Sequence, residues 1–168
     1  MARVETFDRN DIIERAMQVF WKMGYNGTSI QDLVDATGLN RSSIYNSFGS
    51  KQQLYKLTLE FYEQGSNKNI RKALLQSSNA IEAIRKILEL TISSVDKDVS
   101  DKGCFILNCK TELGSSDFRL KKWLLNNQEN SIALFKELVA EGQDEGLINN
   151  AYSSEVYAHS LFCTFQGL

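Results

Sequence analysis

Residues 28–48 read TSIQDLVDATGLNRSSIYNSF. Ile30, Leu33 and Val34 fall on one side of a helix, so the first half of this stretch predicts a short amphipathic helix. Gly38 follows, and glycine turns a chain sharply because it adopts the left-handed conformation without steric cost. Asn40 is a preferred helix cap, and it predicts a second short helix that ends near Ser47. Two short helices joined by a tight turn form a helix-turn-helix.

The second of these helices has an almost purely polar outer face. Ile44 and Phe48, together with Ile30, Leu33 and Leu39, supply the apolar contacts that would hold both helices against a preceding one. Eight residues span about 12 Å, which suits insertion into a DNA major groove. Arginine can bind guanine and asparagine can bind adenine in a bidentate manner. The alternative is an ordinary polar surface helix in a helical bundle.

The sequence predicts phosphate contacts beside this face. Tyr45, Lys51 and Thr28, the last at a helix start, are suitable anchors. The net charge is −2, unlike that of most nucleic-acid binders, but residues 36–51 contain two bases and no acid. The predicted DNA-binding residues are Thr28, Ser29, Asn40, Arg41, Ser42, Ser43, Tyr45, Asn46, Ser47 and Lys51.

The remainder of the chain is also helical in pattern. It contains no proline, and apolar residues recur at helical spacing from Ile12 to Met23 and again over 54–61, 81–95 and 116–141. A last helix is expected after Ser153 or Ser154. No strand pattern is present. We therefore expect an all-α fold with a three-helix helix-turn-helix domain at 1–50 and a helical body for ligand binding and dimerisation at 51–168.

The N-terminal third resembles the DNA-binding domain of the TetR family of repressors. The resemblance covers about the first 55 residues and lies in the spacing of its motifs, which are Gly24-Tyr25, Thr28-Ser29, Ala36-Thr37-Gly38, Tyr45 to Phe48 and Ser50-Lys51. It implies a dimer of all-helical subunits whose body binds a small inducer. It also implies that Thr28, Tyr45 and Lys51 bind phosphate and that Arg41, Ser42, Ser43 and Asn46 contact bases. The family continues into one more helix beyond Leu168, so that last helix is expected to be missing here.

The long helix predicted over 116–141 carries polar residues on its apolar side. Asn127 and Ser131 continue the stripe formed by Leu120, Trp123 and Leu124. Inward-facing polar groups either have structural partners or orient a ligand in an apolar pocket. The candidate ligand-binding residues are Tyr62, Phe105, Asn108, Trp123, Asn127 and Ser131, and for each the alternative is an ordinary core position. The effector would be a small apolar or aromatic molecule.

The three cysteines, Cys104, Cys109 and Cys163, are too few for a disulfide scaffold. His159 and Cys163 are four residues apart, which is an acceptable spacing for metal ligands on a helix. A thiol- or metal-sensing repressor is therefore the alternative function. One histidine and no nucleophile arrangement predict no enzyme activity, and we expect no metal or cofactor.

No apolar run is long enough to span a membrane, and the N-terminus lacks the apolar segment of a signal peptide. The expected location is the cytoplasm, without a membrane partner. The expected function is a ligand-responsive repressor that binds palindromic operator DNA as a homodimer and is released by its effector.

Overall fold

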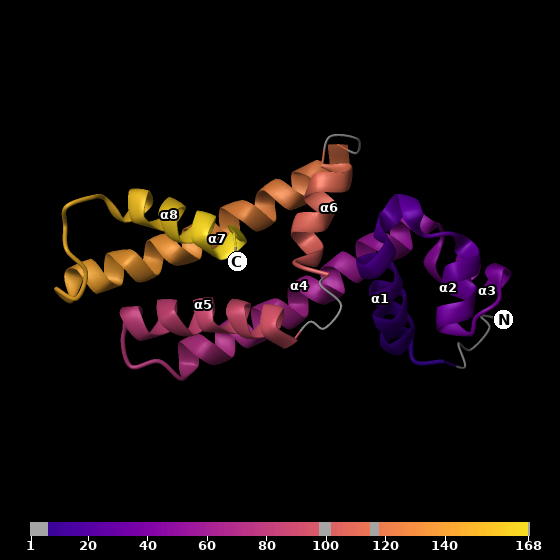
Figure 1. Ribbon diagram of the computed structural model, residues 1–168, viewed down its shortest axis with the longest axis horizontal. Helices are drawn as coiled ribbons and strands as arrows, with labels where there is room; N and C mark the ends of the chain where they lie inside the picture. The colour runs from indigo at the N-terminus through magenta and orange to yellow at the C-terminus, as the bar shows by residue number, and fades with distance from the viewer. Residues whose placement is uncertain (1–6, 98–101, 115–117, 168) are drawn as a thin grey trace. The chain divides into compact units, whose positions relative to one another are not determined.

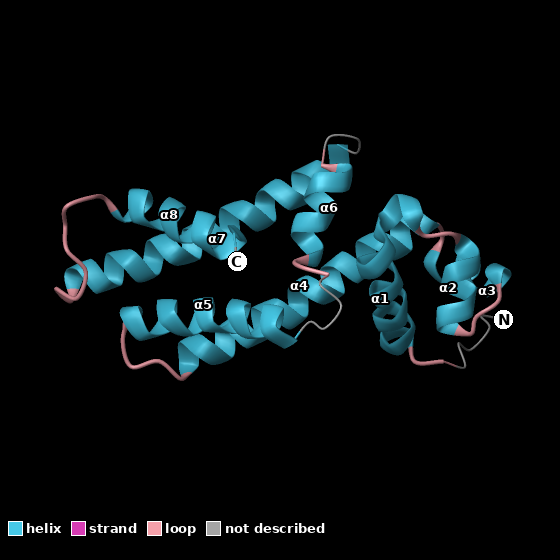
Figure 2. Ribbon diagram, in the orientation of Figure 1, coloured by secondary structure: helices cyan, strands magenta, loops and turns pink. Residues whose placement is uncertain are grey.

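The computed structural model describes residues 7–97, 102–114 and 118–167. These residues form α-helices and no strand, which confirms the expected all-α fold (Figure 2). The helices, labelled in Figure 1, are α1 (Arg9–Gly27), α2 (Ile30–Thr37), α3 (Arg41–Phe48), α4 (Lys51–Leu75), α5 (Ala80–Lys97), α6 (Phe105–Leu113), α7 (Phe118–Asp144) and α8 (Ser154–Gly167). Within the described ranges, none of these helices is long and apolar enough to cross a membrane.

Packing divides the chain into two compact units. The first contains α1, α2, α3, the part of α4 up to Gly65, and α6. The second contains the rest of α4 with α5, α7 and α8. This division differs from the sequence-predicted boundary at residue 50, because α6 packs with the N-terminal helices and α4 contributes to both units.

The first unit is built around the apolar stripe of α1. Ile12, Ala16 and Phe20 are buried, as are Leu33 of α2 and Ile44 of α3. Burying side chains of this size is the main stabilising contribution, at about 1.5–3 kcal/mol for each large one. The two short helices are thereby fixed on α1, as the sequence predicted.

Local signals set the ends of α2 and α3. Ser29 caps α2 in a reciprocal capping box with Asp32, and Asn40 caps α3 by accepting a hydrogen bond from the Ser43 N–H at 2.8 Å. Gly38 has a φ of 72°, the left-handed conformation expected at the turn. The turn at Gly38 and the cap at Asn40 confirm the predicted helix-turn-helix.

The core of the second unit lies between α5, α7 and α8. Its buried residues are Ala83, Ile84, Ile87, Phe135, Leu138, Val139, Ala158 and Phe162.

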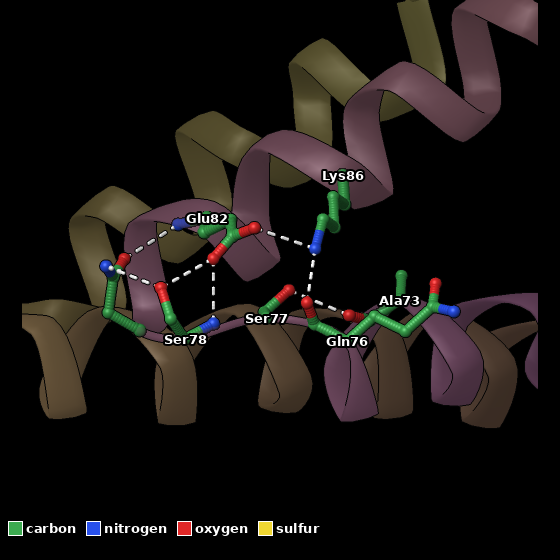
Figure 3. A network of polar contacts seen from close by, with 7 residues as sticks. Ala73, Gln76, Ser77, Ser78, Glu82 and Lys86 are labelled. Carbon is green, nitrogen blue, oxygen red and sulfur yellow. Dashed lines mark hydrogen bonds and ion pairs between the residues drawn. The ribbon is translucent and has the colours of Figure 1, made fainter.

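A polar turn joins α4 to α5, and Figure 3 shows its hydrogen bonds. The Glu82 carboxylate accepts from the N–H of Ser78 at 2.7 Å and from its hydroxyl at 2.6 Å. Lys86 pairs with the same carboxylate at 2.7 Å and also donates to the Gln76 carbonyl.

These contacts favour the ionised form of Glu82. The hydrogen bond from Lys86 and those from Ser78 lower the pKa of Glu82 to about 2. A carboxyl group whose pKa is lowered by folding stabilises the folded state above its unfolded pKa. The stabilisation is then lost as the pH falls from about 4.5 towards 2.

We expect Glu82→Gln to lower the thermal unfolding midpoint at pH 7. The difference from the unsubstituted protein should shrink as the pH is lowered from 4.5 to 2, since Glu82 then takes up a proton and becomes neutral, as glutamine is at every pH. Thermal scans monitored by circular dichroism at several pH values measure this. Glu60→Gln, which removes a simple ion pair with Lys56 within α4, is the control. A midpoint difference that is constant with pH would contradict the prediction.

Candidate nucleic-acid interface

The outer face of α3 is polar and exposed. Arg41, Ser42, Tyr45 and Asn46 are exposed, whereas Ile44 and Phe48 on the opposite side are buried. Tyr45 keeps 42% of its surface accessible although it is aromatic. The helix therefore presents hydrogen-bonding groups outward on an apolar support, which is the arrangement needed to contact the edges of DNA bases.

Other predicted DNA-binding residues form the ends of the helices. Asn40 is exposed, and its amide oxygen holds the first turn of α3. The Ser29 hydroxyl donates to the Asp32 carboxylate at 2.6 Å, and hydrogen bonds from Ser29 lower the pKa of Asp32. Ser43 and Ser47 are half-buried on α3. Ser29 and Asn40 thus hold the helix ends with the side-chain groups that were predicted to contact DNA.

Thr28 has a different role from the predicted one. Its side chain is buried, with 1% of the residue exposed, and its hydroxyl donates to the Gly24 carbonyl at 2.6 Å. A hydroxyl held inside the protein in this way is not presented to a phosphate. The family pattern identified the position, but only the fold shows that its side chain turns inward.

Lys51, at the start of α4, lies against the end of α1. Its Nζ donates to the carbonyls of Tyr25 and Thr28, both at 2.7 Å, and lies 4.3 Å from the centre of the Tyr25 ring. An ammonium group has three donors, so these two carbonyls leave one donor for a further acceptor. Lys51 therefore links α4 to the segment that joins α1 and α2.

Arg9 is not among the DNA-binding residues predicted from the sequence. Its guanidinium donates to the Ser47 carbonyl at 3.0 Å and lies 4.6 Å from the centre of the Phe48 ring. This places a positive charge at the C-terminal end of α3, where the helix dipole is negative. The only available signal was a base at the beginning of the first predicted helix, which does not indicate the end of α3 as its partner.

The residues predicted to bind a ligand fall in both units. In the first unit, Phe105 is 1% exposed, and the rings of Trp21, Tyr55 and Tyr62 lie 5.7–5.9 Å from its own, centre to centre. Phe105 is thus part of a packed aromatic core. Asn108 is exposed, and the Tyr62 hydroxyl lies 4.0 Å from Cys104 Sγ.

In the second unit, Trp123, Asn127 and Ser131 are half-buried on α7. The Ser131 hydroxyl donates to the Asn127 carbonyl at 3.0 Å. Two hollows are found in this unit, one of about 320 Å³ beside the α4–α5 turn and an apolar one of about 230 Å³ lined by α5, α7 and α8. None of the six predicted ligand-binding residues lines either hollow.

The described cysteines are free thiols. Cys104 and Cys163 are exposed, and Cys109 is buried. Burial raises the pKa of the Cys109 thiol. Within the described ranges, no group of three or more histidine, cysteine or acidic side chains is placed to hold a metal ion.

Comparison with known proteins agrees with this geometry. Residues 12–57 match the family model for bacterial regulatory proteins of the tetR family, and residues 80–168 match the tetracyclin repressor-like C-terminal domain. The HTH-type transcriptional regulator YezE of Bacillus subtilis is 29% identical over 149 residues, which cover 89% of this chain and 77% of YezE. The HTH-type transcriptional repressor DhaR of a Mycobacterium species is 26% identical, over 95% of this chain and 79% of DhaR.

A solved structure extends the likeness to nearly the whole chain. A cysteine mutant of the TetR family transcriptional regulator CifR, in complex with 26bp double-strand operator DNA, matches with a TM-score of 0.84 and 26% identity. The match covers 99% of this chain and 87% of the CifR chain. The helix-turn-helix, the helical body and both family models lead to one conclusion: this chain belongs to the TetR family of DNA-binding transcriptional regulators.

Proposed function

We propose that this protein is a repressor that binds palindromic operator DNA as a homodimer and is released by a small apolar or aromatic effector. The observation that carries the proposal is the exposed outer face of α3. Arg41 lies in its first turn, with Ser42 beside it and Asn46 about one turn further on. Arg41 and Asn46 have the donor and acceptor sets that distinguish guanine and adenine, and Ser42 is small enough for the backbone to approach the bases.

Phosphate contacts would fix the register of α3 on the duplex. Tyr45 is exposed beside the base-reading residues, and the remaining donor of Lys51 is available for a phosphate. Arg9 is added to this set because its charge lies at the end of α3. Ser29, Asn40, Ser43 and Ser47 complete the proposed interface through their positions at or on the two short helices.

Dimerisation is proposed because one short recognition helix contacts too few base pairs for useful specificity. Two-fold pairing doubles the site and requires a palindromic operator. In α8, Ala158 and Phe162 are buried within the unit, whereas Val156 is 54% exposed. CifR was solved with a 26bp operator, a length that holds two half-sites about one or more helical turns apart.

The effector would act by shifting a population between two conformations. It must bind a form in which α3 is wrongly placed for DNA more tightly than the DNA-binding form. Tyr62, Phe105, Asn108, Trp123, Asn127 and Ser131 remain the proposed contacts. Asn127 and Ser131 lie one helical turn apart on α7, so they could contact the same ligand.

Thiol sensing is a second candidate for the signal. Cys104 is exposed, directly precedes α6 and lies 4.0 Å from the Tyr62 hydroxyl. The CifR structures with operator DNA were solved with cysteines substituted, which draws attention to the thiols of that protein. Modification of Cys104 would add bulk next to the aromatic core of the first unit.

The proposed DNA contact of Arg41 can be tested on an operator selected from random DNA by the unsubstituted protein. The selected sequence should be palindromic, and Arg41→Ala should weaken its binding by about 1–3 kcal/mol and relax the preference at one base pair of each half-site. Fluorescence anisotropy with a set of single-base operator variants measures both effects. Arg85→Ala, which removes an exposed arginine of α5 in the second unit, is the matched control.

Selection that yields no enriched sequence would overturn the proposed function. If Arg41→Ala and the unsubstituted protein bind the operator with equal affinity, only the assignment of Arg41 to the interface is wrong.

Sedimentation over a range of concentrations tests the dimer. A monomer that binds an isolated half-site as tightly as the palindrome would contradict dimeric binding.

We expect Lys51→Met to act on both stability and DNA affinity. The carbonyls of Tyr25 and Thr28 would lose a charged donor, which lowers the free energy of unfolding by about 1–3 kcal/mol. Loss of one phosphate contact would weaken binding to all sequences alike and reduce the slope of log affinity against log salt by about one. Urea unfolding and salt titrations measure the two effects. An unchanged salt slope would show that Lys51 serves only inside the protein.

The thiol hypothesis predicts an order of reaction with N-ethylmaleimide. Cys104 should react before Cys109, because Cys109 is buried and its thiol has a raised pKa. Mass spectrometry of peptides from a time course gives the order. If Cys104 carries the signal, the reagent should release the operator from the unsubstituted protein and from Cys163→Ser, but not from Cys104→Ser. Equal release from Cys104→Ser would exclude the hypothesis.

A further inference from the structure

The helical conformation of α1 is interrupted near its C-terminal end. Gly24 has φ 72° and ψ 171°, outside the helical region. Such a break separates the following N–H groups from the carbonyls that would accept their hydrogen bonds in a continuous helix. The N–H groups of Tyr25 and Asn26 donate instead to the Glu112 carboxylate of α6, at 2.9 Å and 2.7 Å. One side chain from α6 therefore takes the place of the helical partners.

Glycine at position 24 suits this contact in two ways. Its positive φ is one that other residues rarely adopt. A Cβ at this position would also lie 2.9 Å from Glu112 Oε2, which is closer than a carbon and an oxygen can normally approach. The carboxylate thus occupies the space that a side chain at residue 24 would fill.

The same segment has partners on its carbonyl side. Lys51 donates to the carbonyls of Tyr25 and Thr28, and the Thr28 hydroxyl donates to that of Gly24. We name residues 24–28 the α1–α2 junction. Ser29, the cap of α2, follows it directly, so the position of the junction sets where α2 begins.

We propose that Glu112 is a positioning residue for DNA binding, which holds the α1–α2 junction in the conformation that places α2 and α3 for the operator. The proposal rests on the DNA-binding function proposed above. A carboxylate suits this role because its two oxygens accept both N–H groups, and charge-assisted hydrogen bonds are stronger than neutral ones. Glutamine has one acceptor oxygen and would turn an N–H donor towards one of the two N–H groups.

The test compares Glu112→Gln with the unsubstituted full chain on the selected operator and on random-sequence DNA. We expect affinity for the operator to fall about tenfold, because one backbone donor loses its acceptor. Affinity for random DNA should not fall, since it depends on charge more than on the exact placement of α3 and the substitution removes only a negative charge. Glu82→Gln, which removes a carboxylate acceptor of a backbone N–H in the second unit, is the matched control and should leave both affinities unchanged.

The amide resonances of Tyr25 and Asn26 give a readout that does not depend on DNA. In ¹H–¹⁵N spectra they should move in Glu112→Gln and should not move in Glu82→Gln. Glu112→Asp keeps both acceptor oxygens on a shorter side chain, so its operator affinity should lie between those of the Gln variant and the unsubstituted protein. It also replaces the Gln variant as the test if that variant does not fold.

Unchanged operator affinity in a variant whose Tyr25 and Asn26 resonances have moved would overturn the proposal. An equal loss of affinity for operator and random DNA would also overturn it, because that result indicates general damage to the domain. Failure of the unsubstituted protein to select any operator would instead contradict the proposed function, and the resonances would still report the Glu112 contact.

Discussion

Backbone polar groups at a helix end need partners, and the α1–α2 junction meets this need with charged groups from two other helices. Its N–H groups bind the Glu112 carboxylate, and its carbonyls bind the Lys51 ammonium. Without these partners, the N–H and carbonyl groups at the break would form hydrogen bonds only with water. The direction of the chain that follows would then not be fixed. Because both partners are fixed on helices, the junction has a defined position. The caps and buried residues of α2 and α3 hold these helices in place relative to the junction, so the position of the junction also determines where the outer face of α3 lies.

The aromatic core of the first unit gives α6 the position from which Glu112 acts. Tyr55 of α4 is buried and packs against Phe20 and Tyr25 of α1 and Phe105 of α6. Aromatic pairs of this kind contribute about 0.5–1.5 kcal/mol each beyond the area they bury. Burial and the neighbouring Cys109 raise the pKa of Tyr55, so its hydroxyl stays protonated inside the unit. A change at α6, whether from a ligand or from a modified Cys104, would thus act on the same core that supports the junction.

The sequence was most informative where the interaction is local. Gly38 and Asn40 act within a few residues, so their roles in the helix-turn-helix could be predicted from spacing alone. The direction of Lys51 depends on how α4 packs against α1, and it has no local signal. The contact between Tyr25 and Glu112 joins residues 87 positions apart. The same limit applies to the ligand residues, since the stripe on α7 identifies Asn127 and Ser131 but says nothing of which residues line a cavity.

The inward positions of Thr28 and Lys51 change how the DNA-binding face must work. With the Thr28 hydroxyl and two donors of Lys51 engaged inside the protein, fewer groups remain for phosphate than the family pattern implies. The positive charges at the two ends of α3 are Arg41 in its first turn and Arg9 beside its C-terminal end. Arg9 also offsets the negative end of the α3 dipole, which would otherwise repel the phosphates. In a protein with a net charge of −2, we therefore expect the fit of α3 to the operator to matter more for recognition than total charge. That requirement is why the position of the α1–α2 junction, set from α6 by Glu112, bears on recognition.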